Sequence, residues 1–118
     1  MDFGSGSLAN LARIRDYESQ RLSSWDRTGG NRDCLIVPPG ERATLGEVSG
    51  AGIVKHIWMT MMSWPAEEHE LRQTVLRMWW DGAERPSVEV PLGDFFGIGF
   101  GLRRNFSSLP LQMSPQEG

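Results

Sequence analysis

The stretches that decide the expected fold are residues 76–82, Leu-Arg-Met-Trp-Trp-Asp-Gly, and residues 86–97, Pro-Ser-Val-Glu-Val-Pro-Leu-Gly-Asp-Phe-Phe-Gly. The first is an apolar strand that ends at Asp81-Gly82, a turn dipeptide whose glycine takes a positive φ without steric cost. Alternation through Val88-Glu89-Val90 predicts a second, half-buried strand. Pro91 has no N–H to donate, so this strand ends there or lies at a sheet edge. The two stretches therefore predict two strands joined by a turn.

The residues that follow the second strand carry a candidate for function. Gly93 and Gly97 flank Asp94-Phe95-Phe96, so a carboxylate and two aromatic rings lie on a loop with a permissive backbone. Loops at strand ends commonly carry function. The alternative is a turn with a packed aromatic corner, and the residues alone favour this alternative.

Composition describes a single, turn-rich globular domain or a part of one. The chain has 118 residues, and its 14 glycines and 7 prolines favour short strands over long helices. A net charge of −3 does not indicate the basic surface that binding to nucleic acid requires. The single cysteine, Cys34, excludes an internal disulfide. Five tryptophans stand against one tyrosine, and tryptophan suits cores, interfaces and sugar-stacking surfaces alike.

No targeting or membrane segment is recognisable in the sequence. Residues 1–6 have neither the basic region nor the apolar core of a secretory signal. The longest apolar run, residues 57–62, is too short to cross a bilayer. We therefore expect a soluble, cytoplasmic protein with no membrane partner.

One amphipathic helix is expected, over residues 7–22. Ser7 is a candidate N-cap, and apolar residues recur at helical spacing at Leu8, Leu11, Ala12 and Ile14. We therefore divide the chain into an N-terminal helical segment, residues 1–23, and a strand-rich portion, residues 24–118.

Further strands are expected at residues 34–37, 41–48, 53–62 and 71–80. Residues 53–62 are apolar on both faces, which predicts a strand buried between two layers. Short strands with turns every ten residues or so are typical of an antiparallel sandwich or jelly roll. The expected fold is mainly β: a partial, antiparallel jelly-roll-type β-sandwich with one N-terminal helix. Residues 109–118 begin like another strand and stop, so we expect a truncated domain.

The chemically densest loop is residues 23–33. Carboxylates and an amide beside an indole face can bind the vicinal hydroxyls of a sugar while the ring stacks on its C–H face. The alternative is a surface loop whose charges pair with one another. The residues alone leave both readings open. The side chains concerned are Trp25, Asp26, Arg27, Asn31, Arg32 and Asp33.

The two histidines do not predict a metal site. His56 lies in an expected strand, where a lone histidine is most often a satisfied core residue, and His69 lies in an acidic, solvated stretch. They are thirteen positions apart and lack the spacing of a zinc site. We expect neither a metal nor a cofactor.

Four separated stretches together resemble the N-terminal part of glycoside hydrolase family 172. They are residues 24–33, 52–60, 76–82 and 86–97, and the last run is the most specific. The resemblance extends from about Tyr17 onward. It implies two consecutive jelly rolls assembled into trimers or hexamers.

The same resemblance implies a retaining activity on α-D-fructofuranosides or D-arabinofuranosides, with a glutamate nucleophile and a glutamate acid/base. Both glutamates lie beyond the region matched here, so the catalytic residues are unknown and neither role is mapped onto Glu84 or Glu89. Retention requires two carboxyl groups about 5–5.5 Å apart. The chain is then expected to supply scaffold, subunit contacts and part of the sugar-binding wall.

The residues expected to form this wall sit in the family-like stretches. An alternative is a non-catalytic jelly-roll module for carbohydrate binding or assembly, which the tryptophan content and the lack of a compact catalytic set favour. The substrate-binding candidates are Trp25, Asp26, Asn31 and Asp33, followed by His56, Trp58, Asp94 and Phe96.

Overall fold

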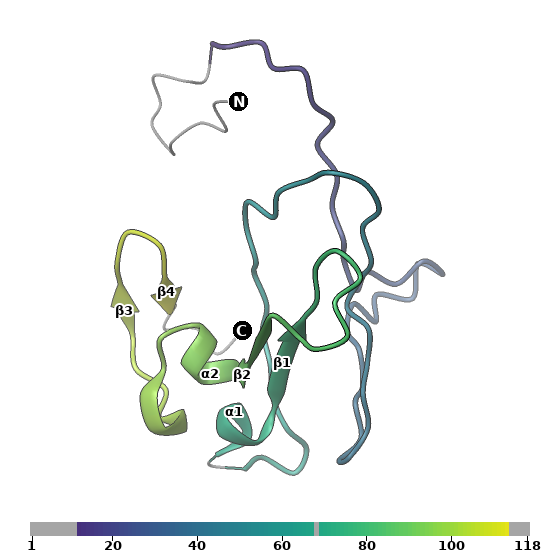
Figure 1. The fold of residues 1–118 in the computed structure, drawn as a ribbon. Helices are drawn as coiled ribbons and strands as arrows, with labels where there is room; N and C mark the ends of the chain where they lie inside the picture. The colour runs from purple at the N-terminus through teal and green to yellow at the C-terminus, as the bar shows by residue number, and fades with distance from the viewer. Residues whose placement is uncertain (1–11, 68, 114–118) are drawn as a thin grey trace. The chain divides into compact units, whose positions relative to one another are not determined.

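The computed structural model describes residues 12–67 and 69–113. The chain divides into two units, Met1–Ile53 and Val54–Gly118 (Figure 1). Every helix and strand of the described residues lies in the second unit. The expected division at residue 23 stays a prediction.

The central hairpin of the second unit pairs β1 (Val75–Met78) with β2 (Val88–Pro91) in an antiparallel ladder. The chain turns at Asp81 and Gly82, with φ angles of 54° and 70°. Aspartate tolerates the left-handed region because its short side chain can hydrogen-bond locally. The predicted pair of strands, with its turn and its end at Pro91, is confirmed. The first strand is shorter than the expected 71–80, because residues 70–73 form helix α1 and only Val75–Met78 pair with β2.

Two short helices, α1 (Glu70–Gln73) and α2 (Leu92–Phe95), pack beside this hairpin, and the 3-10 turn η2 (Gly99–Gly101) packs against both helices. Among the described residues, the buried core consists of four aliphatic side chains, one each from α1, β1 and α2 and one from the residue that precedes η2. Since α1 and α2 approach closely, a Cβ built on Gly93 would lie 3.0 Å from Leu71 Cβ. The core residues are Leu71, Leu76, Leu92 and Ile98.

The stretch expected as a functional loop, Asp94-Phe95-Phe96, is the end of helix α2 and its C-cap. Phe95 and Phe96 form a T-shaped pair with ring centroids 5.1 Å apart, and both pack against the core. Gly97 follows with a φ of 82°. The aromatic corner is therefore the reading that the structure supports.

A second small sheet pairs β3 (Phe106–Ser107) with β4 (Gln112–Met113). Ser108 N–H donates to the Leu111 carbonyl oxygen over 2.8 Å, which closes the connection between the two strands. Phe106 and Met113 are cross-strand partners and pack against the core.

The expected helix over residues 7–22 is not present in its described part. Residues 7–11 lie outside the described residues, and residues 12–22 carry no helix. Helices of this length gain most of their stability by packing an apolar face. The side chain of Ile14 is fully exposed, so that packing does not occur here.

Three expected strands form no ladder among the described residues: 34–37, 41–48 and 53–62. Burial of residues 53–62 between two layers is wrong, because only one face is covered. Met59 and Met61 pack on the core, whereas Trp58 and Met62 are 72% and 79% exposed. The described strands form two small antiparallel sheets. A jelly-roll sandwich therefore remains a prediction.

Candidate functional site

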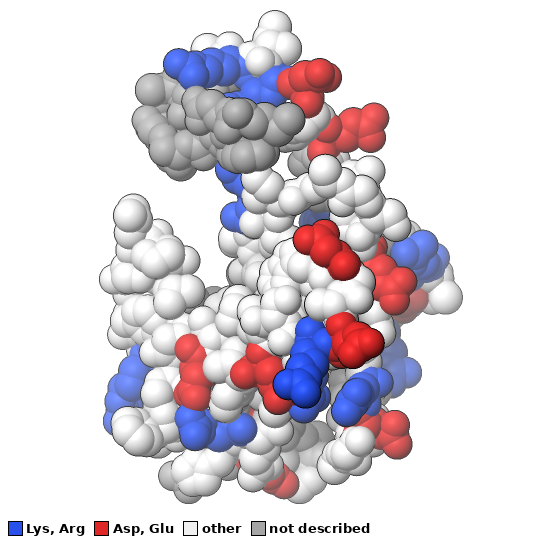
Figure 2. Space-filling view, viewed as in Figure 1, with Lys and Arg blue, Asp and Glu red and all other residues white. Residues whose placement is uncertain are grey.

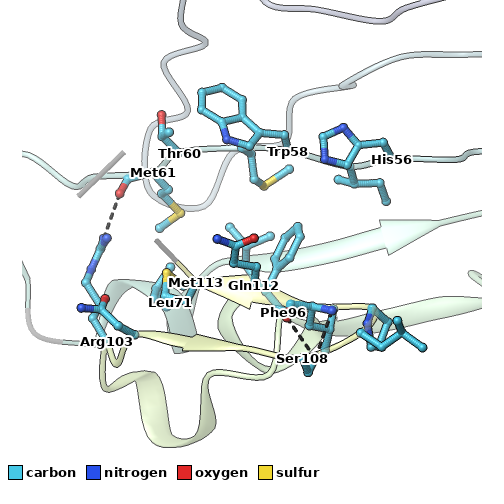
Figure 3. Close-up of a pocket in the computed structure, with 17 residues that line it drawn as sticks. His56, Trp58, Thr60, Met61, Leu71, Phe96, Arg103, Ser108, Gln112 and Met113 are labelled. Carbon is cyan, nitrogen blue, oxygen red and sulfur yellow. Dashed lines mark hydrogen bonds between the residues drawn. The ribbon is translucent and has the colours of Figure 1, made fainter. Parts of the chain in front are cut away.

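A groove of about 570 Å³ runs through the second unit (Figure 3). Residues 56–61 form one wall, and the β3–β4 hairpin with its connection forms the other. Leu71, Leu92 and Phe96 contribute apolar surface from the helices. The groove is therefore assembled from segments that lie far apart in the sequence.

Three of the sequence-predicted site residues, His56, Trp58 and Phe96, line this one groove. His56 and Trp58 share a face because side chains two positions apart in an extended chain point the same way. The exposed indole of Trp58 offers an apolar face and one N–H donor. Such a ring can stack on a planar or C–H-rich ligand.

Polar side chains of the groove come mainly from the opposite wall and were not expected from the sequence. Asn105 and Gln112 bring amides, which both donate and accept hydrogen bonds. Ser108 Oγ donates to the Leu111 carbonyl over 2.9 Å, so its hydroxyl partly serves the turn. No local pattern marks these residues, because the β3–β4 hairpin alone brings them to the groove.

Arg103 connects the two walls. Its Nη2 donates to the Met61 carbonyl oxygen over 2.8 Å and also to Glu70 Oε1. Figure 3 shows Arg103 reaching toward Met61. The second oxygen of Glu70, Oε2, accepts the Ser63 N–H over 2.6 Å. This set of contacts ties residues 61–63 to helix α1 and to the segment before β3.

Glu70 is an ionised acceptor in this set. Burial raises the pKa of its carboxyl, but the hydrogen bonds from Ser63 and Arg103 and the positive charge of Arg103 outweigh burial, so the pKa lies below its ordinary value. A general acid in glycoside hydrolysis needs a raised pKa. The local chemistry of Glu70 therefore fits a structural anchor better than an acid catalyst.

Asp94 is not among the residues that line the groove. Its Oδ2 accepts from Arg72 Nη1, which joins helices α1 and α2, while its buried Oδ1 has no hydrogen-bond partner within the described ranges. Figure 2 shows acidic and basic side chains interleaved on the visible face. The ion pair places Asp94 in the scaffold.

The carboxylates of the first unit's candidate loop stabilise the loop itself. Asp26 Oδ1 accepts from the backbone N–H and the hydroxyl of Thr28, over 2.9 and 2.7 Å, and its Oδ2 accepts the Arg32 N–H over 3.1 Å. Asp33 Oδ1 accepts the Asp26 N–H over 2.7 Å. The hydroxyl and then the backbone N–H of Thr28 lead the hydrogen bonds that lower the pKa of Asp26.

The same loop leaves Trp25 and Asn31 exposed. Asn31 has a φ of 59°, and the Arg27 guanidinium lies 5.6 Å from the Trp25 ring centroid, where it covers one face of the indole. A Cβ on Gly30 would lie 2.8 Å from Asp26 Oδ2, so a larger residue there would displace the Asp26 carboxylate. Both carboxylates are thus engaged within their own loop, mostly by backbone N–H groups, and a role in sugar binding stays a prediction.

Metal ligands do not gather in residues 12–67 and 69–113: these ranges hold no group of three His, Cys, Asp or Glu side chains arranged for an ion. Nor does any helix within them have the length and apolarity needed to span a membrane.

Comparison with known proteins gives one match. A family model described as GH172 domain-like matches residues 31–117, which include every residue that lines the groove, and Asn31 and Asp33 of the loop. No curated protein and no solved structure matches the chain.

Proposed function

Because this chain belongs to the GH172 domain-like family, we propose that it forms the sugar-binding wall and scaffold of a retaining, furanosidase-type glycoside hydrolase. The observation that carries the proposal is the groove of the second unit. An exposed indole, Trp58, and two amides, Asn105 and Gln112, line a volume of about 570 Å³ within the family-matched residues.

The chemistry of the groove suits a fructofuranoside or an arabinofuranoside. The C–H face of a sugar ring stacks on an aromatic side chain, and amides bind adjacent hydroxyls through paired donors and acceptors. Trp58 would hold the ring, and Asn105 with Gln112 would orient its hydroxyl groups. The roles of these residues are binding and orientation.

The two catalytic carboxyl groups are proposed to come from residues outside the described groove. Retaining hydrolysis needs a nucleophilic carboxylate and a carboxylic acid about 5–5.5 Å apart. The described lining of the groove contains no aspartate or glutamate, and the nearby Glu70 is bound by Ser63 and Arg103. Assembly into a trimer or hexamer, and a cytoplasmic location, belong to this same proposal.

A second candidate function is a non-catalytic module for carbohydrate binding or assembly. It is favoured by the same combination of an exposed Trp58 and a described lining without carboxylates. The natural gene product separates the two candidates. A product of 118 residues favours the module, and a product several hundred residues long that turns over furanosides favours the hydrolase.

Sugar binding is tested by fluorescence titration of the chain with D-fructose and D-arabinose. We expect quenching that is lost in Trp58→Ala and kept in the matched control Trp64→Ala, because Trp64 is 91% exposed and does not line the groove. Quenching that persists in Trp58→Ala would contradict the proposed site. Hydrolysis of a nitrophenyl arabinofuranoside by the 118-residue chain would contradict the external origin of the catalytic carboxyl groups.

A further inference from the structure

We propose that Arg103 is the oxyanion-binding group of the groove, so that the groove prefers a sugar carrying a carboxylate or a phosphate over the neutral sugar. This inference rests on the proposed sugar-binding function and adds a substrate class to it.

Only some of the hydrogen-bond donors of the Arg103 guanidinium bind groups in the described part of the protein. Both of its recorded hydrogen bonds, to the Met61 carbonyl and to Glu70, leave from Nη2. Within the part of the chain that the structure describes, the N–H groups on Nε and Nη1 have no recorded partner. The side chain is 36% exposed and belongs to the groove lining. Donors therefore remain for a ligand.

Glu70 holds the Arg103 guanidinium in position without itself lining the groove. Its side chain is only 10% exposed, and it is not one of the residues that line the groove. Its charge is shared between the Arg103 guanidinium and the Ser63 N–H, which binds Oε2. Glu70 is thus a positioning residue: it holds Arg103 in place, so less side-chain entropy is lost when a ligand binds.

The charge of the lining also favours an anion. The described lining contains Arg103 and His56 as its only basic side chains and no acidic one. Guanidinium groups present planar, forked donors that match carboxylate and phosphate oxygens. An acidic sugar could thus bind Arg103 through its oxyanion while its ring lies along the groove.

The preference is expected to be modest because Arg103 is partly exposed and Glu70 offsets part of its charge. Exposed charge pairs are worth up to about 1 kcal/mol, which corresponds to an affinity ratio of about fivefold. We therefore expect the anionic sugar to bind about fivefold more tightly than its neutral counterpart, with the ratio falling as salt screens the pair.

Matched sugar pairs test this preference by fluorescence titration of the full chain. D-fructose 6-phosphate is compared with D-fructose, and D-glucuronate with D-glucose, so that phosphate and carboxylate are assessed separately. The test variant is Glu70→Gln with Arg103→Gln, which removes both charges and leaves no unpaired buried carboxylate. Arg77→Gln is the control, since Arg77 pairs with Glu89 on the hairpin outside the groove.

We expect the anion preference in the wild-type chain and in Arg77→Gln, and its loss in the double variant. The readout is the ratio of the affinities for the anionic and the neutral sugar within each variant, because losing the Arg103–Glu70 contacts also changes the support of residues 61–63. Equal affinity for neutral and anionic sugars would overturn the inference and leave the proposed function standing. A preference that survives in the double variant would overturn the role of Arg103. If no sugar binds, both the inference and the proposed function fail.

Discussion

Arg77 and Glu89 are directly opposed in the β1–β2 ladder, and Arg77 Nε donates to Glu89 Oε2 over 2.6 Å. The pair is partly exposed, with side-chain exposures of 30% and 54%. Cross-strand ion pairs of this kind contribute little to stability. Glu89, one of the two glutamates to which no catalytic role was assigned, is therefore engaged in the sheet.

Replacing Glu89 by glutamine should lower the free energy of unfolding by less than about 1 kcal/mol, because an exposed ion pair contributes no more than that. Urea unfolding of the variant and the wild-type chain measures the difference. A larger loss would show that the pair has a greater structural role than its exposure indicates.

Replacing Ile98 by alanine should cost about 2–5 kcal/mol, the usual range for emptying a buried aliphatic site. Ile98 is 2% exposed and belongs to a core that comprises four buried aliphatic residues within ranges 12–67 and 69–113. The loss should unfold most of the second unit, as followed by near-UV circular dichroism. Val75→Ala is the control, since Val75 is 41% exposed, and an equal effect of both changes would argue against this core.

Replacing Gly93 by alanine should destabilise the second unit by about 1–3 kcal/mol, the usual cost of overpacking. The added Cβ would lie 3.0 Å from Leu71 Cβ and 3.3 Å from the Ile98 carbonyl oxygen. Gly99→Ala is the matched control, because nothing lies within 4 Å of the Cβ built there. Thermal unfolding of the two variants should rank Gly99→Ala as the more stable.

The order of residues 24–33 should depend on pH through Asp26. Hydrogen bonds, first of all from the Thr28 hydroxyl, hold the pKa of Asp26 below the value of 3.8 for an unperturbed aspartate. A carboxyl with a lowered folded-state pKa contributes stability above the unfolded pKa, and this contribution is lost as the pH falls through the folded pKa.

The loop contacts should therefore be complete at neutral pH and weaken only in acid below about pH 4. Thr28→Ala should move the pKa of Asp26 back toward its ordinary value, and an NMR titration of the side-chain carboxyl carbon measures the change. Thr60→Ala is the control, since Thr60 lies outside this loop. An unchanged pKa in Thr28→Ala would contradict the hydrogen bonds assigned to Asp26.

Local sequence was sufficient to predict the hairpin and the turn-rich loop. Asp81-Gly82 sets a left-handed turn, and the alternation of Val88-Glu89-Val90 sets which side chains face the core. These features depend on neighbours a few positions apart. Alternation also correctly places Met59 and Met61 on the opposite face from Trp58, although the expected burial of both faces is wrong.

The burial of side chains and the pairing of strands could not be predicted from the local sequence in the same way. A strand needs a second strand beside it and a helix needs a surface to cover, so residues 34–37, 41–48 and 12–22 have the expected patterns without the expected elements. Contacts outside the local pattern also decided what two of the candidate site residues do. Asp94 forms an ion pair with Arg72, and Asp26 accepts hydrogen bonds from the backbone of its own loop.

The amino-acid sequence by itself determined the family, the turn chemistry and the set of aromatic side chains available for binding. Only the tertiary structure decided which side chains from distant parts of the sequence lie together. Arg103 reaches Glu70 across 33 positions and Met61 across 42. No local periodicity encodes such contacts, because they depend on how the helices and the β3–β4 hairpin pack around the buried core of Leu71, Leu92 and Ile98.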